Sequence, residues 1–285
     1  MPQAGESLWP APAKLNLFLH ITGRRADGYH ELQTLFQLVE LCDSVGFTPR
    51  ADGRIVRTGG LADVRPDDDL TIRAARSLQA ASGSKLGASV RVIKRIPTGG
   101  GLGGGSSDAA TTLLALNALW QTNLPIETLV KLGLTLGADV PIFIYGSTAW
   151  AEGLGEQLTP VELPPSWFLI LYPGIAVATR EIFQAPELTR NSPRLTMRAI
   201  LESGSSRNDC EAVVRARFPE VARAFEWLER WAPARLTGTG SCLFAQFASA
   251  AEAERVAARA PDCWRSFVVP GLNSSPINER LRASE

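Results

Sequence analysis

A glycine-rich run at residues 97–108 carries the clearest chemical signal in the chain. It reads Pro-Thr-Gly-Gly-Gly-Leu-Gly-Gly-Gly-Ser-Ser-Asp, so half of its twelve residues are glycine, which adopts positive φ freely and lets backbone approach a ligand closely. Apolar alternation over residues 90–96 predicts a strand before the run. Helical periodicity over residues 109–120 predicts a helix after it, with Ser106 and Ser107 as N-caps. Because a helix N-terminus offers free N–H groups and a positive dipole end, the run predicts a polyphosphate site.

Three other types of nucleotide loop fit the run less well. A Walker A loop needs a lysine at the helix start, and no lysine occurs between Gly99 and Gln121. The run does contain GxGxxG, but a second helical stretch follows where a Rossmann unit requires a strand. A protein-kinase glycine loop would need His-Arg-Asp and Asp-Phe-Gly downstream, and neither tripeptide occurs. A flexible linker is disfavoured because the run lies between a strand and an apolar helix.

A second candidate is a cation and an amide on one strand. Residues 12–21 alternate in a way that predicts a strand with two distinct faces. One face carries Ala13, Leu15, Leu17, Leu19 and Ile21, and the other carries Lys14, Asn16, Phe18 and His20. Only four basic residues of the chain are lysine, which makes Lys14 notable. The pattern is equally typical of a solvated strand edge.

Asp139 is a candidate base. It follows a predicted helix at residues 126–136 and precedes the apolar run 140–144, which we predict to be a strand. A carboxylate at this junction is expected to be partly desolvated, which would raise its pKa toward that of a general base. The alternative is a turn aspartate that accepts hydrogen bonds from nearby backbone N–H groups.

Tyr29 and His30 are candidates for contact with a planar ligand. The Asp27-Gly28 pair predicts a turn, and a second strand is expected at residues 32–41. An aromatic ring and an imidazole at a hairpin mouth suit stacking and hydrogen bonding. Local packing accounts for them equally well.

The elements that must position these residues indicate two domains. Residues 69–81 predict a helix in the first half of the chain. In the second half, strands are predicted at residues 168–172, 235–237, 242–247 and 264–269, and helices at 179–183, 219–231 and 249–260. The main order, β-α-β-β-α-β, is that of a ferredoxin-like sandwich. We place the boundary in the proline-rich stretch 159–165, giving domains 1–160 and 161–285.

The composition favours a globular enzyme that acts on a small molecule. The 285 residues are 45% apolar and 20% charged, with 29 basic and 29 acidic side chains, so no global charge attracts nucleic acid or membrane. The four cysteines (Cys42, Cys210, Cys242 and Cys263) lack zinc-site spacing and are predicted to be reduced core thiols of a cytoplasmic protein. The sequence predicts no secretion signal and no membrane span. It leaves monomer and homodimer open.

Three separated motifs together resemble the galactokinase, homoserine kinase, mevalonate kinase and phosphomevalonate kinase (GHMP) superfamily. They are Pro-Ala-Lys-Leu-Asn-Leu at residues 12–17, the glycine run at 97–108, and Leu-Thr-Gly-Thr-Gly-Ser-Cys-Leu-Phe at 236–244. The resemblance implies an α+β fold: an N-terminal ribosomal-protein-S5-domain-2-like β/α domain and a C-terminal ferredoxin-like domain. With Asp-Gly-Tyr-His at 27–30 and Gly-Ala-Asp-Val-Pro at 137–141, the motifs are similar to those of the kinases that act on 4-diphosphocytidyl-2-C-methyl-D-erythritol in non-mevalonate isoprenoid synthesis.

The resemblance implies a role for each matching residue. ATP and Mg²⁺ are the expected cofactors, with Lys14 and Asp139 as the catalytic pair. The residues expected around the ATP phosphates are Pro97, Thr98, Gly99, Gly100, Gly101, Leu102, Gly103, Gly104, Gly105, Ser106 and Ser107. Those expected at the cytidyl substrate are Asn16, Tyr29, His30, Thr179 and Phe183, and the supporting phosphate loop is Gly238, Thr239, Gly240 and Ser241.

Two acidic residues qualify this reading. Asp69-Leu70 stands where the family commonly has Asn-Leu, near the expected adenosine. Asp108 lies in the first turn of the phosphate-binding helix, where its charge would repel phosphate, so we expect it to face away. The alternatives left open are another GHMP kinase, of mevalonate or homoserine type, a nucleotide-binding regulator without turnover, and an RNA-binding protein, which the neutral charge disfavours.

Overall fold

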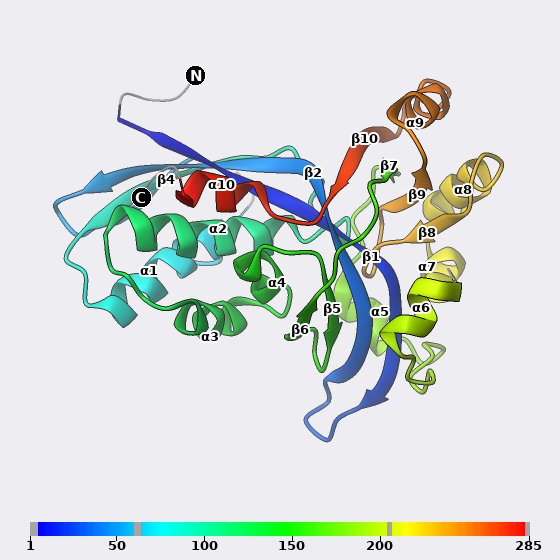
Figure 1. The fold of residues 1–285 in the computed structure, drawn as a ribbon, viewed down its shortest axis with the longest axis horizontal. Helices are drawn as coiled ribbons and strands as arrows, with labels where there is room; N and C mark the ends of the chain where they lie inside the picture. The colour runs from blue at the N-terminus through cyan, green and yellow to red at the C-terminus, as the bar shows by residue number, and fades with distance from the viewer. Residues whose placement is uncertain (1–4, 60–63, 204–206, 283–285) are drawn as a thin grey trace.

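Two long antiparallel strands form the backbone of the molecule. The computed structural model describes residues 5–59, 64–203 and 207–282. Strands β1 (Ser7–Arg24) and β2 (His30–Arg50) pair along most of their length and run through both halves of the fold (Figure 1). Both extend beyond the predicted ranges at each end. Register shifts between Asn16 and Leu19 break the expected strict alternation in β1.

The N-terminal half packs helices on one side of this ribbon (Figure 1). The sheet continues from β2 to β4 and β3 on one side, and a short hairpin, β5–β6, pairs with β2 farther along. These strands are β3 (Ile55–Gly59), β4 (Gly87–Ile93), β5 (Ala149–Glu152) and β6 (Gln157–Pro160). The helices are α1 (Leu70–Ser82), α2 (Gly104–Leu119), α3 (Ile126–Leu136) and α4 (Val140–Tyr145). Apolar residues of sheet and helices form one buried cluster, which includes Phe47, Leu78, Leu113 and Ile142.

The C-terminal half confirms the predicted ferredoxin-like order. Its strands are β7 (Trp167–Tyr172), β8 (Ala234–Leu236), β9 (Leu243–Phe247) and β10 (Arg265–Leu272), arranged β10-β7-β9-β8 with antiparallel pairs throughout. Its helices are α5 (Thr179–Gln184), α6 (Met197–Ser203), α7 (Glu211–Arg217), α8 (Pro219–Leu228) and α9 (Ala250–Ala257). The Ser249 hydroxyl accepts a hydrogen bond from the Glu252 N–H at 3.3 Å and so caps the N-terminus of α9, within the helical range predicted at residues 249–260.

The two halves share one sheet. The end of β10 pairs with the middle of β2, through Gly271 with Val39 and Leu272 with Leu38. The chain then enters α10 (Pro276–Arg282), whose Ile277 is buried in the N-terminal cluster. The division at residue 160 remains a prediction, but these last residues pack with the N-terminal core and not with the domain to which we assigned them.

Three local predictions are wrong. Residues 140–144 form helix α4, with Pro141 in its first turn and Gly146 as its C-cap; a short buried apolar run does not distinguish helix from strand by periodicity. Helix α2 starts at Gly104 with Gly103 as N-cap, so Ser106 and Ser107 lie within its first turn and do not cap it. Of the four free thiols, only Cys210 and Cys242 are buried, whereas Cys263 is exposed.

Several elements carried too weak a sequence signal to be predicted: β3, β5, β6, α6, α7 and α10, all of eight residues or fewer. Within the described ranges, no helix is long and apolar enough to cross a bilayer.

Candidate active site

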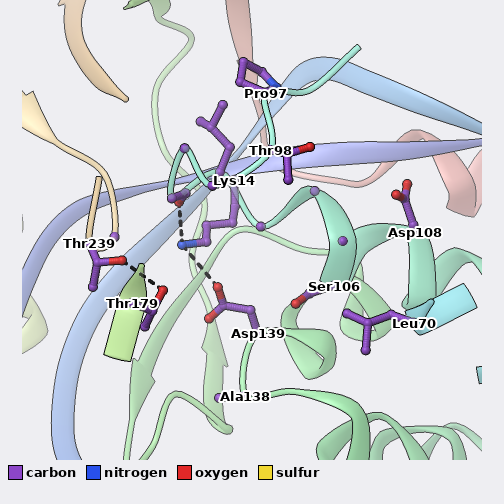
Figure 2. Close-up of a pocket in the computed structure, with 18 of the residues that line it drawn as sticks. Lys14, Leu70, Pro97, Thr98, Ser106, Asp108, Ala138, Asp139, Thr179 and Thr239 are labelled. Atoms are coloured by element: carbon purple, nitrogen blue, oxygen red, sulfur yellow. Dashed lines mark hydrogen bonds and ion pairs between the residues drawn. The ribbon is translucent and has the colours of Figure 1, made fainter. Parts of the chain in front are cut away.

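A cavity of about 570 Å³ lies where the two halves meet. Its volume falls within the roughly 300–1,000 Å³ typical of small-molecule sites. The glycine run, the start of α1, the middle of β1 and the first part of β2 supply most of its walls, and α5 with the loop after β8 closes it from the C-terminal half. Lining residues include Lys14, Asn16, Asp139, Thr179, Phe183, Gly238, Thr239 and every residue from Pro97 to Ser106 (Figure 2). The cavity thus brings together groups up to 225 positions apart in the sequence.

Hydrogen bonds from neighbouring segments fix the backbone of the glycine run. Gly99, Gly101 and Gly103 have φ of +70°, +75° and +73°, the left-handed region in which glycine is favoured. The carbonyl oxygens of the run accept hydrogen bonds from β1, from the loop between β7 and α5, and from the loop before β9, so few of them are free to repel an anion. The bonds are Lys14 N–H to Leu102 O (3.0 Å), Val177 N–H to Gly99 O (3.2 Å) and Cys242 N–H to Gly100 O (3.1 Å).

We expect Gly103→Val to weaken ATP binding severely in a folded protein. A Cβ at this position would lie 2.8 Å from the Phe143 ring and 3.3 Å from Lys14 Cε, and its φ is one that valine avoids. Isothermal titration with a non-hydrolysable ATP analogue measures the effect, and circular dichroism monitors the fold. Gly83→Val, a change at the exposed left-handed C-cap of α1 with nothing within 4 Å, is the matched control for backbone strain. Unchanged affinity in folded Gly103→Val would show that the phosphates lie elsewhere.

Lys14 is the central cation of the cavity. Its ammonium donates to Asn16 Oδ1 at 2.6 Å and Gly101 O at 3.1 Å, and it forms an ion pair with Asp139 Oδ2 at 3.4 Å (Figure 2). Its side chain is 3% exposed, so three oxygen partners fix the charge at the floor of the cavity beside the glycine run. A cation held in this way is preorganised for negative charge.

Asp139 is partly exposed at the start of α4. It immediately precedes α4, and its side chain is 37% exposed. The carboxylate accepts no capping hydrogen bond from the backbone N–H groups at the start of α4. The expected partial desolvation agrees with this intermediate exposure, whereas the turn-aspartate alternative is wrong. Instead, an accessible carboxylate faces the cavity next to Lys14, where a substrate hydroxyl can reach it.

Two buried carboxylates, Asp43 and Asp108, and the partly buried Lys94 form a cluster that the sequence did not reveal. The Lys94 ammonium contacts Asp43 and donates to Asp108 Oδ2 at 2.8 Å. Asp108 lines the cavity and does not face away as we expected, yet its charge is shared with Lys94. Burial, which outweighs the attraction of Lys94, raises the pKa of Asp108 to about 7, and repulsion from Asp43 adds to this. Its Oδ1 and the Ser107 hydroxyl are buried and have no hydrogen-bond partner among the residues that the structure describes.

Asp69 has a structural role at the same end of the cavity. Its carboxylate accepts from the Thr71 N–H at 2.9 Å, which caps α1, and pairs with Arg57 at 3.3 Å. Asp69 and Leu70 both line the cavity. The acidic residue that replaces the family's usual asparagine is thus neutralised by an arginine.

Asn16 belongs to a buried polar network. Its side-chain amide donates to Thr34 Oγ1 at 2.9 Å, and its backbone N–H donates to Thr237 Oγ1 at 3.1 Å. Because Thr237 precedes the loop 238–241, this bond joins β1 to the C-terminal half directly beneath the cavity.

The expected cytidyl-binding residues are only partly brought together. His30 stacks on Phe183 with centroids 5.2 Å apart and an interplanar angle of 27°, and its Nε2 accepts from Arg190 Nε at 3.1 Å. Burial and the nearby Arg190 lower the pKa of His30, so the ring is neutral at pH 7. Phe183 lines the cavity, whereas Tyr29 is 64% exposed at the hairpin tip and does not. Arg190 gave no sequence signal.

Half of the supporting loop reaches the cavity. Gly238 and Thr239 line it, and the Thr239 hydroxyl lies 3.0 Å from that of Thr179 across the opening (Figure 2). The N–H groups of Gly240 and Ser241 donate to Thr237 O and Gly99 O. They are therefore occupied by protein carbonyls, and the expected contribution to phosphate binding is restricted to the first two residues.

Two family models match the chain on either side of the predicted boundary. Residues 69–147 match the N-terminal domain of GHMP kinases and residues 184–266 match their C-terminal domain. The chain is similar over nearly its full length to two curated proteins named 4-diphosphocytidyl-2-C-methyl-D-erythritol kinase. One, from Halorhodospira halophila, is 54% identical, with 96% of each chain covered; the other, from Nitrosococcus oceani, is 56% identical, with 96% of this chain and 98% of the relative covered.

Solved structures show the same fold. A 4-(cytidine 5'-diphospho)-2C-methyl-D-erythritol kinase superposes with a TM-score of 0.81 at 36% identity, covering 93% of this chain and 99% of the other. The mevalonate kinase of Methanococcus jannaschii gives a TM-score of 0.70 at 16% identity, covering 95% and 100%, a likeness of fold alone.

Proposed function

The chain belongs to the GHMP kinases, and within them to the 4-diphosphocytidyl-2-C-methyl-D-erythritol kinases, and we propose that it phosphorylates the 2-hydroxyl of 4-diphosphocytidyl-2-C-methyl-D-erythritol. It is an ATP-dependent small-molecule kinase of the non-mevalonate isoprenoid route. The observation that carries the proposal for the site is the Lys14–Asp139 pair, 3.4 Å apart, facing the glycine run in one cavity. A cytoplasmic location, expected from composition, remains part of the proposal.

The proposed chemistry divides between the two catalytic groups. Asp139 accepts the proton of the substrate hydroxyl as the oxygen attacks the γ-phosphorus of ATP. Lys14 stabilises the negative charge that develops on the transferred group. The glycine run and the start of α2 hold the phosphates in line, so the protein contributes chiefly position and charge.

Mg²⁺ is proposed as the ion that accompanies ATP. In the described part of the chain, no three His, Cys, Asp or Glu side chains converge on a possible metal. The Ser106 hydroxyl and the Asp139 carboxylate both line the cavity, and this small set of oxygens fits an ion that takes its other ligands from phosphate and water. When bound, the ion would neutralise phosphate charge. Ser106 and Asp139 are the residues that would hold it.

Substrate recognition is proposed to depend on the Phe183 wall. Phe183 offers an aromatic face already stacked on neutral His30, and Arg190 supports the pair through the His30 ring nitrogen and the Phe183 carbonyl, at 3.0 Å. Asn16 and Thr179 supply polar atoms nearby. A role for Tyr29 requires the turn at residues 25–29 to fold toward the cavity when substrate binds, and it remains a prediction.

A coupled ADP-release assay with ATP, Mg²⁺ and three separate acceptors tests the assignment. We expect turnover of 4-diphosphocytidyl-2-C-methyl-D-erythritol and none of mevalonate or homoserine, because neither of these fills a site built for a planar ring. A reaction without acceptor corrects for ATP hydrolysis. Turnover of mevalonate alone would refute the substrate while leaving the kinase assignment intact. No turnover of any acceptor by folded, ATP-binding protein would favour a regulator.

A further inference from the structure

A second cavity lies on the opposite face of the β1–β2 ribbon. Its volume is about 190 Å³, below the range of drug-sized pockets but adequate for a small metabolite. Leu17 and Leu35 line it, whereas the flanking Asn16, Thr34 and Phe36 line the active-site cavity. Because side chains alternate along a strand, the same two strands separate the two cavities.

The walls of this cavity are mostly apolar. Leu17, Phe18, Leu35, Leu163, Phe168 and Ile200 surround it, and Gln37, Ser166 and Gln246 contribute polar edges. The Gln37 amide nitrogen is committed to Leu272 O at 2.9 Å and to two further acceptors. An apolar ligand group would therefore meet little competing polarity.

One charged group, Arg235, lies in this apolar setting. Across the described ranges it has no ion pair, and its one hydrogen bond is a long contact from Nη1 to Leu17 O at 3.5 Å. Burial lowers the pKa of Arg235, which reflects the cost of holding this charge away from water. By contrast, two other largely buried cations have acidic partners: Lys94 has Asp43 and Asp108, and Arg57 has Asp69. A guanidinium in this state lacks the carboxylate or phosphate that it binds best.

We propose that this second cavity binds a small organic anion, a carboxylate or phosphate monoester on a short apolar chain, with its charged group on Arg235 and its chain among the leucine and phenylalanine side chains. The anion would supply the missing counter-charge, and the chain would displace water from apolar walls. The site is independent of the acceptor that the kinase uses.

Titration of the purified protein by NMR, following the Arg235 Nε–Hε signal, tests the proposal with hexanoate and n-butyl phosphate as separate probes. We expect saturable binding of at least one probe, and the comparison distinguishes carboxylate from phosphate. Hexanol and inorganic phosphate should bind at least about tenfold more weakly, because hexanol lacks the anionic group and inorganic phosphate lacks the apolar chain. A saturating non-hydrolysable ATP analogue should not displace the probe.

Two variants separate charge from shape. Arg235→Gln should weaken the probe at least tenfold, whereas Arg230→Gln, at an exposed arginine of the same domain, should leave binding unchanged. Leu163→Trp, at a partly exposed wall position, should block the cavity while retaining the guanidinium, and it decides the matter if Arg235→Gln fails to fold. Equal binding to wild type and Leu163→Trp, displacement by the ATP analogue, or no saturable binding of either probe would overturn the proposal.

Discussion

In Asp139→Asn we expect kcat to fall at least about 100-fold, with the fold and the KM for ATP nearly unchanged. A positioned general base contributes roughly 10²–10⁴-fold, and asparagine cannot accept the proton. The amide is nearly isosteric, so the substitution leaves no cavity, and the Lys14 ammonium, which loses its ion pair, keeps its hydrogen bonds to Asn16 Oδ1 and Gly101 O. Steady-state kinetics with the cytidyl acceptor gives kcat and both KM values.

The matched control is Asp262→Asn, which makes the same chemical change at an exposed carboxylate between α9 and β10. Its kinetics should equal those of the wild type. Turnover by Asp139→Asn within a few-fold of wild type would remove Asp139 from proton transfer and leave it as a partner of Lys14 alone.

The second large effect is expected for Lys14→Met, which removes the charge while keeping most of the side-chain length. We expect kcat to fall about 10²–10³-fold, as when one preorganised transition-state donor is lost, and KM for the acceptor to rise much less. Asp139 would lose its cation but remains partly in water, so the fold should persist. Circular dichroism and thermal unfolding monitor this directly.

Lys131→Met, an exposed position on α3, controls for the loss of a lysine charge. The change in kcat compared with the change in KM distinguishes a role of Lys14 in the transition state from a role in substrate binding. If only KM rises, Lys14 binds the ground state and not the transition state, and its proposed role in neutralising developing charge is wrong.

The sequence revealed the parts of the site that are encoded locally. The glycine run was recognisable because its residues are consecutive and their backbone needs are specific, as the positive φ at Gly99, Gly101 and Gly103 confirms. The ferredoxin-like order followed from alternating strands and amphipathic helices. The Lys14–Asp139 pairing joins residues 125 positions apart, and periodicity alone could not have predicted it. The family motifs supplied that pairing, and the observed geometry agrees with it.

What the sequence missed depends on packing between distant elements. The apolar run at residues 140–144 does not by itself distinguish a helix from a strand. The helix that it forms packs closely on α3, where a Cβ added at Gly133 would lie 2.8 Å from the Val140 side chain. Asp108 faces the cavity because Lys94 lies beside it, and no local pattern indicates that pair. The bulge between Asn16 and Leu19 likewise turns Leu19 toward the active-site cavity, against the simple alternation on which our strand faces depended.

The return of the chain to its starting half has a consequence for synthesis on the ribosome. Strand β10 pairs with residues 38 and 39 of β2, and Ile277 of α10 is buried among residues of the first 151 positions. Translation delivers these residues after the other strands and helices of both halves, so the N-terminal core cannot be complete while the C-terminal half is being made. The glycine run leaves the ribosome before Thr237 and Cys242 are synthesised. Until then, its carbonyl oxygens lack the hydrogen bonds that these two residues donate. The geometry of the glycine run therefore depends on residues of both halves and not on the first domain alone.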